Sequence, residues 1–153
     1  MGGGCRGRRL AAAMVGEGHA VRITTRRQQR RGAIEAAGAE CWVGTPDRLA
    51  TLRGALDGVA ILCWLMASAT GPEAELGALH GERLRFFLTQ AIDTTVRGLV
   101  YEAAGRGAEG EPVARALAER NAIPAAFLTS DPDELDSWLA QARAEIDALL
   151  CGR

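Results

Sequence analysis

The residues best suited to chemistry lie at the start of the chain, where glycines surround a cysteine and an arginine. Gly2, Gly4 and Gly7 fit the spacing G-x-G-x-x-G, with Cys5 and Arg6 between the last two. In such a turn the first glycine permits a tight bend, the second lets a pyrophosphate approach the backbone, and the third lets the following helix pack closely. The helix N-terminus then faces the phosphates. We therefore expect these five residues to bind a dinucleotide; a disordered glycine-rich tail is the alternative.

A second group of candidates follows about 20 residues downstream, where dinucleotide-binding proteins recognise the adenosine ribose. The sequence has Thr25, Arg26 and Arg27 there, and no Asp or Glu. An acidic residue would accept a hydrogen bond from the 2′-hydroxyl of NAD, whereas arginine suits the 2′-phosphate of NADP. The sequence thus favours NADP as cofactor and keeps NAD as the alternative. The alternative to cofactor binding is that Arg26 and Arg27, together with Arg30 and Arg31, only form the solvated start of a helix.

Candidates for acid–base or nucleophilic catalysis are few. All 18 basic residues are Arg, and the absence of Lys excludes a Schiff base or a lysine-assisted tyrosine. We expect Tyr101 to be a packed residue with a hydrogen-bonded hydroxyl, and Glu102, next to it in the chain, to point to the other side of the sheet. His80 is either a general base or, more simply, an exposed helix residue. Cys63 lies in an apolar run and is expected to be inert. The catalytic residues stay unknown.

The cysteines give no metal motif. Cys5, Cys41, Cys63 and Cys151 are widely spaced, without a CxxC pair, and only two histidines accompany them. We expect reduced, mostly buried thiols and no metal site.

Composition limits the class of protein. The chain has 153 residues, which fits one domain spanning residues 1–153. Hydrophobic residues make up 48%, charged residues 24%, and the formal net charge is −1, so nothing draws the chain as a whole toward nucleic acid or anionic lipid. No apolar run approaches a membrane span, and no signal peptide is recognisable, so a cytoplasmic location is expected.

The elements that must position these residues alternate between short apolar runs and longer helical stretches, which is typical of an α/β fold with a parallel sheet. The pattern predicts strands at residues 20–25, 41–44, 59–66, 97–104 and 123–128. It predicts helices at residues 8–17, 30–37, 47–56, 73–92, 112–121 and 133–150, the last capped by Ser130 or Asp131. The helix over 73–92 is expected to be interrupted near Gly77 or Gly81. Residues 105–111 are expected to be flexible. The three tryptophans, Trp42, Trp64 and Trp138, are expected to pack in the core or on helix faces.

Three segments carry a resemblance to a known family: GGGCRGRRLAAAMVGEGHAVRITTR, ALDGVAILCWLMASATG and VRGLVYEAAG. They resemble atypical short-chain dehydrogenase/reductases of the NAD(P)-dependent epimerase/dehydratase-like group, over most of the chain. The resemblance implies a Rossmann-like doubly wound, mostly parallel sheet with helices on both faces. It implies that the glycine turn binds pyrophosphate and that the pair after the second strand contacts the ribose. It also places the loop of Leu65, Met66, Ala67 and Ser68 along the cofactor.

The sequence departs from this family at the catalytic centre. The family's Tyr-x-x-x-Lys pattern lies on the helix after the fifth strand, and the corresponding helix at residues 112–121 has neither residue. Three hypotheses follow: an NADP(H)-binding oxidoreductase or epimerase-like enzyme, a non-catalytic dinucleotide-binding redox sensor or regulatory protein, and a truncated inactive family member. The small-molecule substrate and the oligomeric state stay open.

The position of the glycine turn leads to one more expectation. A dinucleotide glycine turn joins a strand to a helix, and only Met1 precedes Gly2. In the strand order 3-2-1-4-5-6 that first strand is central, between the strands predicted at residues 20–25 and 59–66. We expect the first strand of the fold to be missing from this chain, encoded as a short apolar segment upstream of an incorrectly assigned start.

Overall fold

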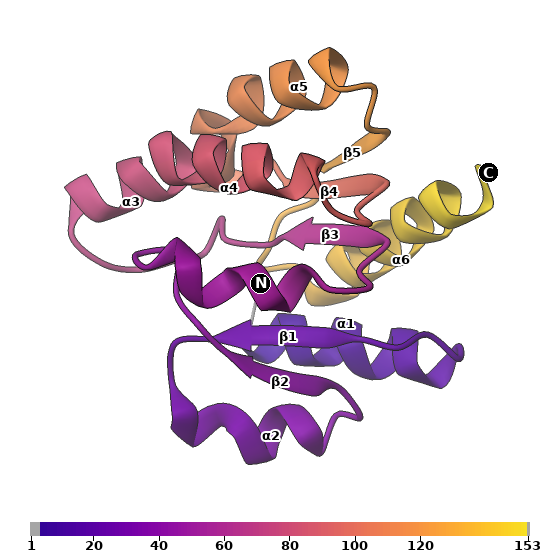
Figure 1. Ribbon diagram of the computed structural model, residues 1–153. Coiled ribbons are helices and arrows are strands. Elements are labelled where there is room, and N and C mark those ends of the chain that lie inside the picture. Colours follow the sequence, from indigo (N-terminus) through magenta and orange to yellow (C-terminus); the bar gives the residue numbers. More distant parts are fainter. Residues whose placement is uncertain (1–3, 153) are drawn as a thin grey trace.

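The strands form two separate parallel sheets in the computed structural model, which describes residues 4–152 (Figure 1). One sheet pairs β1 with β2, and the other has the order β3-β4-β5. The strands are β1 (Arg22–Thr25), β2 (Glu40–Val43), β3 (Ile61–Trp64), β4 (Gly98–Glu102) and β5 (Ala125–Leu128). Every pair is parallel, which requires a crossover between successive strands. The α/β, Rossmann-like fold predicted from the sequence is confirmed.

Helices cover both faces of this arrangement (Figure 1). One face carries α1 (Cys5–Gly16) and α6 (Leu135–Cys151). The other carries the 3₁₀ helix η2 (Leu49–Leu56), α4 (Glu82–Ile92) and α5 (Glu111–Arg120). The remaining helices are η1 (Gln28–Arg30) and α2 (Arg31–Glu35) near β2, and α3 (Glu73–His80) and η3 (Gly105–Glu109) near α4 and α5.

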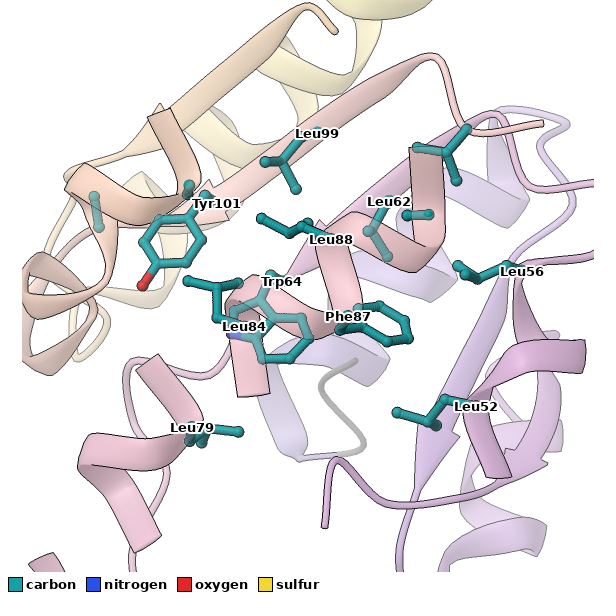
Figure 2. Packing of buried hydrophobic residues seen from close by; sticks show 14 residues of the cluster. Leu52, Leu56, Leu62, Trp64, Leu79, Leu84, Phe87, Leu88, Leu99 and Tyr101 are labelled. Atoms are coloured by element: carbon teal, nitrogen blue, oxygen red, sulfur yellow. The ribbon is translucent and has the colours of Figure 1, made fainter. Parts of the chain in front are cut away.

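The larger hydrophobic cluster lies between the three-stranded sheet and the face covered by α4 (Figure 2). Trp64 of β3 is fully buried there, and its ring lies 5.4 Å from that of Phe87, centroid to centroid. Side chains alternate across the sheet, so Leu99 and Tyr101 of β4 enter this cluster while Val100 points toward α1 and α6. Every residue of β4 is buried, as expected for the middle strand.

The tryptophans behave as expected, with one difference in degree. Trp64 and Trp138 are buried, and Trp138 packs from α6 in the second cluster. Trp42 is half-buried, and its indole N–H donates to the carbonyl of Thr51.

Several local predictions were wrong. Residues 105–109 form a 3₁₀ helix, where flexibility was expected. Helix α6 begins after Glu134 without a side-chain cap within the described chain, and Asp131 instead accepts a hydrogen bond from the Asp133 amide. The cysteines are not mostly buried: Cys5 and Cys151 are exposed. By contrast, the interruption expected in the helix over 73–92 is present, and it lies at Gly81.

None of the helices within residues 4–152 has both the length and the apolar character that a membrane crossing requires.

Candidate functional site: a pocket at the carboxyl ends of the strands

A pocket of about 600 Å³ opens where β1 and β3 end and α1 begins. Its walls come from the α1 N-terminus, the segments after β1, β2 and β3, and the loop before α6. In open parallel sheets the crevice outside the carboxyl ends of the strands is the usual ligand site. The volume lies in the range of small-molecule and cofactor pockets.

The N-terminus of α1 offers unsatisfied backbone donors to this pocket. Gly4 is the N-cap residue, and no side chain within residues 4–152 caps the helix. The first turn contains no acidic residue and contains Arg6 and Arg8. No acidic residue of the first turn offsets the partial positive charge of this helix N-terminus, which favours an anion.

The end of β1 brings the predicted ribose-binding residues to the same pocket. Thr25 is buried, and its hydroxyl accepts a hydrogen bond of 3.2 Å from the backbone N–H of Arg27. Arg26 and Arg27 are exposed and line the pocket. Neither forms an ion pair with an acidic residue in the described part of the chain. Their positive charges are therefore available to a ligand.

Arg6 is held by a buried acidic residue at the end of β4. Its Nη2 lies 3.2 Å from Oε1 of Glu102 and donates to the Ser68 hydroxyl at 2.6 Å. The guanidinium also lies over the ring of Trp138, 5.0 Å from the centroid. Nη1 of Arg6 is buried, and no residue from 4 to 152 accepts a hydrogen bond from it.

Glu102 has no solvent exposure and accepts two further hydrogen bonds. The indole N–H of Trp138 donates to Oε1 at 2.9 Å, and the backbone N–H of Ala67 donates to Oε2 at 2.8 Å. A buried carboxylate requires such partners, because burial without them costs several kcal/mol. The Glu102 network therefore connects α1, the loop after β3, β4 and α6. The sequence predicted only that Glu102 would point to the other side of the sheet from Tyr101.

The structure brings most of the sequence-predicted site residues together. Those that line the pocket are Gly4, Cys5, Arg6, Gly7, Thr25, Arg26, Arg27, Leu65, Met66 and Ser68. Gly2 lies outside the described residues. Ala67 does not line the pocket; it is buried, and its N–H is the donor to Glu102.

Sequence reasoning missed an ion pair at the wall of the pocket. Arg83 of α4 reaches Asp47 at 2.5 Å, and both residues line the pocket. Asp47 also accepts a hydrogen bond of 2.9 Å from the Thr45 hydroxyl. The pair joins α4 to the loop after β2, and no short-range motif in the sequence marks it.

His80 and Tyr101 form a buried pair away from the pocket lining. The tyrosine hydroxyl donates to the carbonyl of Gly107 at 2.8 Å and lies 3.1 Å from Nδ1 of His80. The expectation of an exposed His80 was wrong: only 2% of its surface is accessible. Burial lowers the pKa of His80 and raises the pKa of Tyr101. Tyr101 is packed and hydrogen-bonded, as predicted, and its hydroxyl points away from Leu62 and Leu99 (Figure 2).

Cys63 behaves as a small hydrophobic residue. It is half-buried within β3, and burial raises the pKa of its thiol to about 11. The thiolate population at neutral pH is consequently very small, which argues against a nucleophilic role.

A surface cluster brings Glu17, His19 and Asp147 together, with possible ligand atoms within 4.8 Å of one another. Arg143 already pairs with Glu17. This pairing reduces the attraction of the cluster for a cation.

The fold is similar to those of several solved structures. The protein gox2253 superposes with a TM-score of 0.69 at 21% identity, over 83% of this chain and 48% of that one. The fold is Rossmann-like. Triphenylmethane reductase of Citrobacter sp., complexed with NADP(H), gives a TM-score of 0.64 at 18% identity, over 83% of this chain and 46% of its own. The NADPH-dependent quinone oxidoreductase QOR2 of Escherichia coli, complexed with NADPH, gives a TM-score of 0.61 at 19% identity, over 84% of this chain and 46% of its own.

This chain thus spans slightly less than half the length of the structures that it matches. The sequence matches no protein-family model and no curated protein.

Proposed function

We propose that the chain is an NAD(P)-binding unit of the atypical short-chain dehydrogenase/reductase type that prefers NADP(H). The observation that carries the proposal is the convergence of an uncapped helix N-terminus and two arginines without acidic partners on one pocket of about 600 Å³. An NADP molecule is a polyanion with a pyrophosphate and a 2′-phosphate. The two cationic features of this pocket match those two groups.

In the proposed binding mode, the backbone N–H groups that begin α1 bind the pyrophosphate, and Gly4 and Gly7 leave room for it. Arg6 lies beside this position, and its buried Nη1 gains an acceptor when a phosphate oxygen is near. Gly2 belongs to the same turn by sequence.

The adenosine end lies at the end of β1 in the proposed mode. Arg26 binds the 2′-phosphate, Arg27 assists, and Thr25 fixes the turn between them through its hydroxyl. The absence of an acidic residue at this position favours NADP over NAD. Leu65, Met66 and Ser68 line the part of the pocket left for the nicotinamide.

The bound dinucleotide would supply hydride transfer, and this chain's residues would bind and orient it. Two NADP(H)-bound neighbours in the comparison are reductases, which supports an oxidoreductase. The sequence has no Lys, and Tyr101 is buried at a site outside the pocket lining, so any proton donor differs from a Tyr-Lys pair. The second candidate function is that of a dinucleotide-binding sensor without turnover. The absence of Lys and the position of Tyr101 outside the pocket lining favour it.

A fluorescence titration with NADPH and NADH tests the binding proposal. Replacing Arg26 by Asp removes a charge-assisted contact worth about 1.5–3 kcal/mol, so the Kd for NADPH should rise about tenfold or more while the Kd for NADH changes little. Arg97→Asp is the matched control, because Arg97 is exposed at the amino end of β4, where the strand begins. Equal weakening of both cofactors by the Arg26 change would contradict the assignment.

Consumption of NADPH in the presence of carbonyl and quinone substrates then separates the two candidate functions. Turnover supports the reductase. Tight binding without turnover supports the sensor.

A further inference from the structure

The cofactor pocket has opposite charge at its two ends. Arginines line the end reached from β1, where the 2′-phosphate is proposed to bind. The other end lies between the loop after β3 and the segment before α6, and two acidic residues, Glu75 and Asp133, line it. Arg6, whose guanidinium reaches Ser68 in that loop, is already paired with Glu102. The end of the pocket left for a substrate is therefore acidic.

Neither of these carboxylates has a basic partner in the part of the chain that the structure describes. Glu75 is exposed in the first turn of α3, and Asp133 is exposed two residues before α6 begins. Neither forms an ion pair with an arginine from residue 4 to residue 152. A carboxylate on a pocket wall keeps its attraction for a cation when no neighbouring charge of the protein offsets it.

The surroundings of the two carboxylates combine negative charge with apolar surface. A Cβ at Gly71 would lie 3.7 Å from Oε2 of Glu75, which places this carboxylate beside the loop after β3. Residues 129–137, which include Asp133, contain four acidic residues and no basic residue. The apolar side chains that line the same part of the pocket are those of Met66, Leu76 and Leu135. This lining fits a ligand that has an apolar body and a positive charge.

The pocket also lacks the side chains that most often donate a proton to a reduced carbonyl. No Tyr, His or Lys is among the residues from 4 to 152 that line it. A hydride added to a carbonyl carbon leaves an alkoxide, which needs a proton. A hydride added to an iminium ion or to an N-alkylated heteroaromatic cation leaves a neutral amine, which needs none. The side chains of the pocket thus favour the same class of acceptor as its charge does.

We propose that the acidic end of the pocket binds a cationic hydride acceptor with an apolar body, either an iminium ion or an N-alkylated heteroaromatic cation. The inference rests on the proposed function, because NADPH is the reductant. The acceptor carbon gains a C–H bond as the C–H bond at the reactive nicotinamide carbon breaks, with both electrons entering the new bond. The π electrons of the conjugated C=N bond shift onto nitrogen. The acceptor becomes a neutral amine, NADPH becomes NADP⁺, and no proton is taken up. Glu75 and Asp133 hold the cation by charge and keep their own protonation state.

Fluorescence titration of the cofactor-free chain with N-methylacridinium measures binding of such a cation. Acridine has the same ring system and is uncharged in mildly alkaline buffer, so it is the neutral control ligand. The pocket variant Glu75→Gln/Asp133→Asn removes both carboxylates. Asp93→Asn/Glu119→Gln is the matched control variant, because it removes the same charge from exposed residues that do not line the pocket.

N-methylacridinium should bind more tightly than acridine to the unaltered chain. The pocket variant should raise the Kd for N-methylacridinium about three- to tenfold and leave the Kd for acridine unchanged, because each exposed ion pair contributes modestly to binding. Added salt should reduce the difference between the two ligands, since it screens exposed charges. The control variant should bind both ligands as the unaltered chain does.

Consumption of NADPH in the presence of N-methylacridinium, above the rate without protein, tests the hydride transfer. At low concentrations of N-methylacridinium the pocket variant should consume NADPH more slowly, by about the same factor as its loss of cation affinity. Its Kd for NADPH, titrated alone, should stay unchanged, because the two carboxylates lie at the other end of the pocket from the arginines.

Three outcomes overturn the inference while the proposed function stands: equal affinity for N-methylacridinium and acridine, equal weakening by the control variant, or binding of both NADPH and N-methylacridinium without consumption of NADPH. Failure of NADPH to bind would refute the proposed function, and this inference with it. The two failures are distinguishable, because the acridinium titration contains no dinucleotide and the NADPH titration contains no acridinium.

Discussion

The fully buried carboxylate of Glu102 provides the most direct test of how the pocket is held together. It accepts hydrogen bonds from Trp138 and from the backbone of Ala67, and it pairs with Arg6. Glu102→Gln keeps the size of the side chain but removes its charge and one acceptor oxygen. One of the three donors must then face the amide NH₂ group, which is itself a donor.

The size of the effect follows from these three contacts. Loss of the charge-assisted contact with Arg6 costs about 1.5–3 kcal/mol, and a buried donor left without an acceptor costs about 1–3 kcal/mol. Because the contacts share one carboxylate, the losses do not simply add, and we expect a total near 3 kcal/mol. For a chain of this size that corresponds to a fall in melting temperature of about 6–12 °C.

Thermal and urea unfolding of the variant measure this loss. Glu119→Gln is the matched control, since Glu119 is exposed on α5 and its substitution should change stability by less than about 0.5 kcal/mol. A double-mutant cycle with Arg6→Met isolates the Arg6–Glu102 coupling, expected at about 1 kcal/mol or more. A loss below about 1 kcal/mol for Glu102→Gln would refute the view that this network holds α1 in place.

Three further changes probe the buried residues behind the pocket. Tyr101→Phe removes the hydroxyl contacts with Gly107 and His80, so it should lower the free energy of unfolding in urea by about 1–2 kcal/mol and leave NADPH affinity unchanged. A large change of affinity would restore a role for Tyr101 at the cofactor site. Gly107→Ala places a Cβ against the backbone carbonyl of Glu102, which forces the backbone to shift, so we expect the free energy of unfolding to fall by more than about 2 kcal/mol. An unchanged free energy of unfolding would show that η3 adapts freely. Burial lowers the pKa of His80 in the folded state below 6.5, although the charge of Glu109 opposes this shift, so the contribution of neutral His80 to stability is complete above pH 6.5 and decreases as the pH falls through that value. Urea unfolding at several pH values should show this decrease, and His80→Asn should make the dependence of stability on pH less steep.

The periodicity of the sequence was sufficient to predict the order of strands and helices. Residues 59–66 and 97–104 are apolar enough to identify buried strands, and β3 and β4 lie within them. Gly18 and Gly38 end the first two helical segments with positive φ angles, +93° and +79°, which glycine adopts without strain. Such signals depend only on residues close together in the sequence, so they can be recognised without knowledge of the tertiary structure.

The pocket could be predicted in part for the same reason. The glycine turn and the arginines after β1 are each contiguous in sequence, and parallel topology brings them to one edge. Glu102 could not be assigned a role in this way. Its partners Ala67 and Trp138 lie 35 and 36 residues away, and an acidic residue in a strand carries no sequence signal for a buried indole donor.

His80 was mispredicted because helix periodicity indicates which face is apolar but not which polar residue is buried with it. The side chain of His80 lies on α3, and the hydroxyl that it meets comes from β4. Burial of an imidazole depends on such a partner, which only the packed structure provides.

The Glu102 network also explains how the start of α1 keeps its place although β1 and β3 are not joined. In a continuous sheet, the strand between them would fix the start of α1. Here Arg6 is fixed to β4 and α6 instead, through Glu102 and the ring of Trp138. Because Arg6 is already paired with Glu102, Arg6 positions the helix N-terminus more than it attracts an anion. In the proposed binding mode, the charge that distinguishes NADP from NAD therefore comes from Arg26 and Arg27, which is why the Arg26 variant is expected to separate the two cofactors.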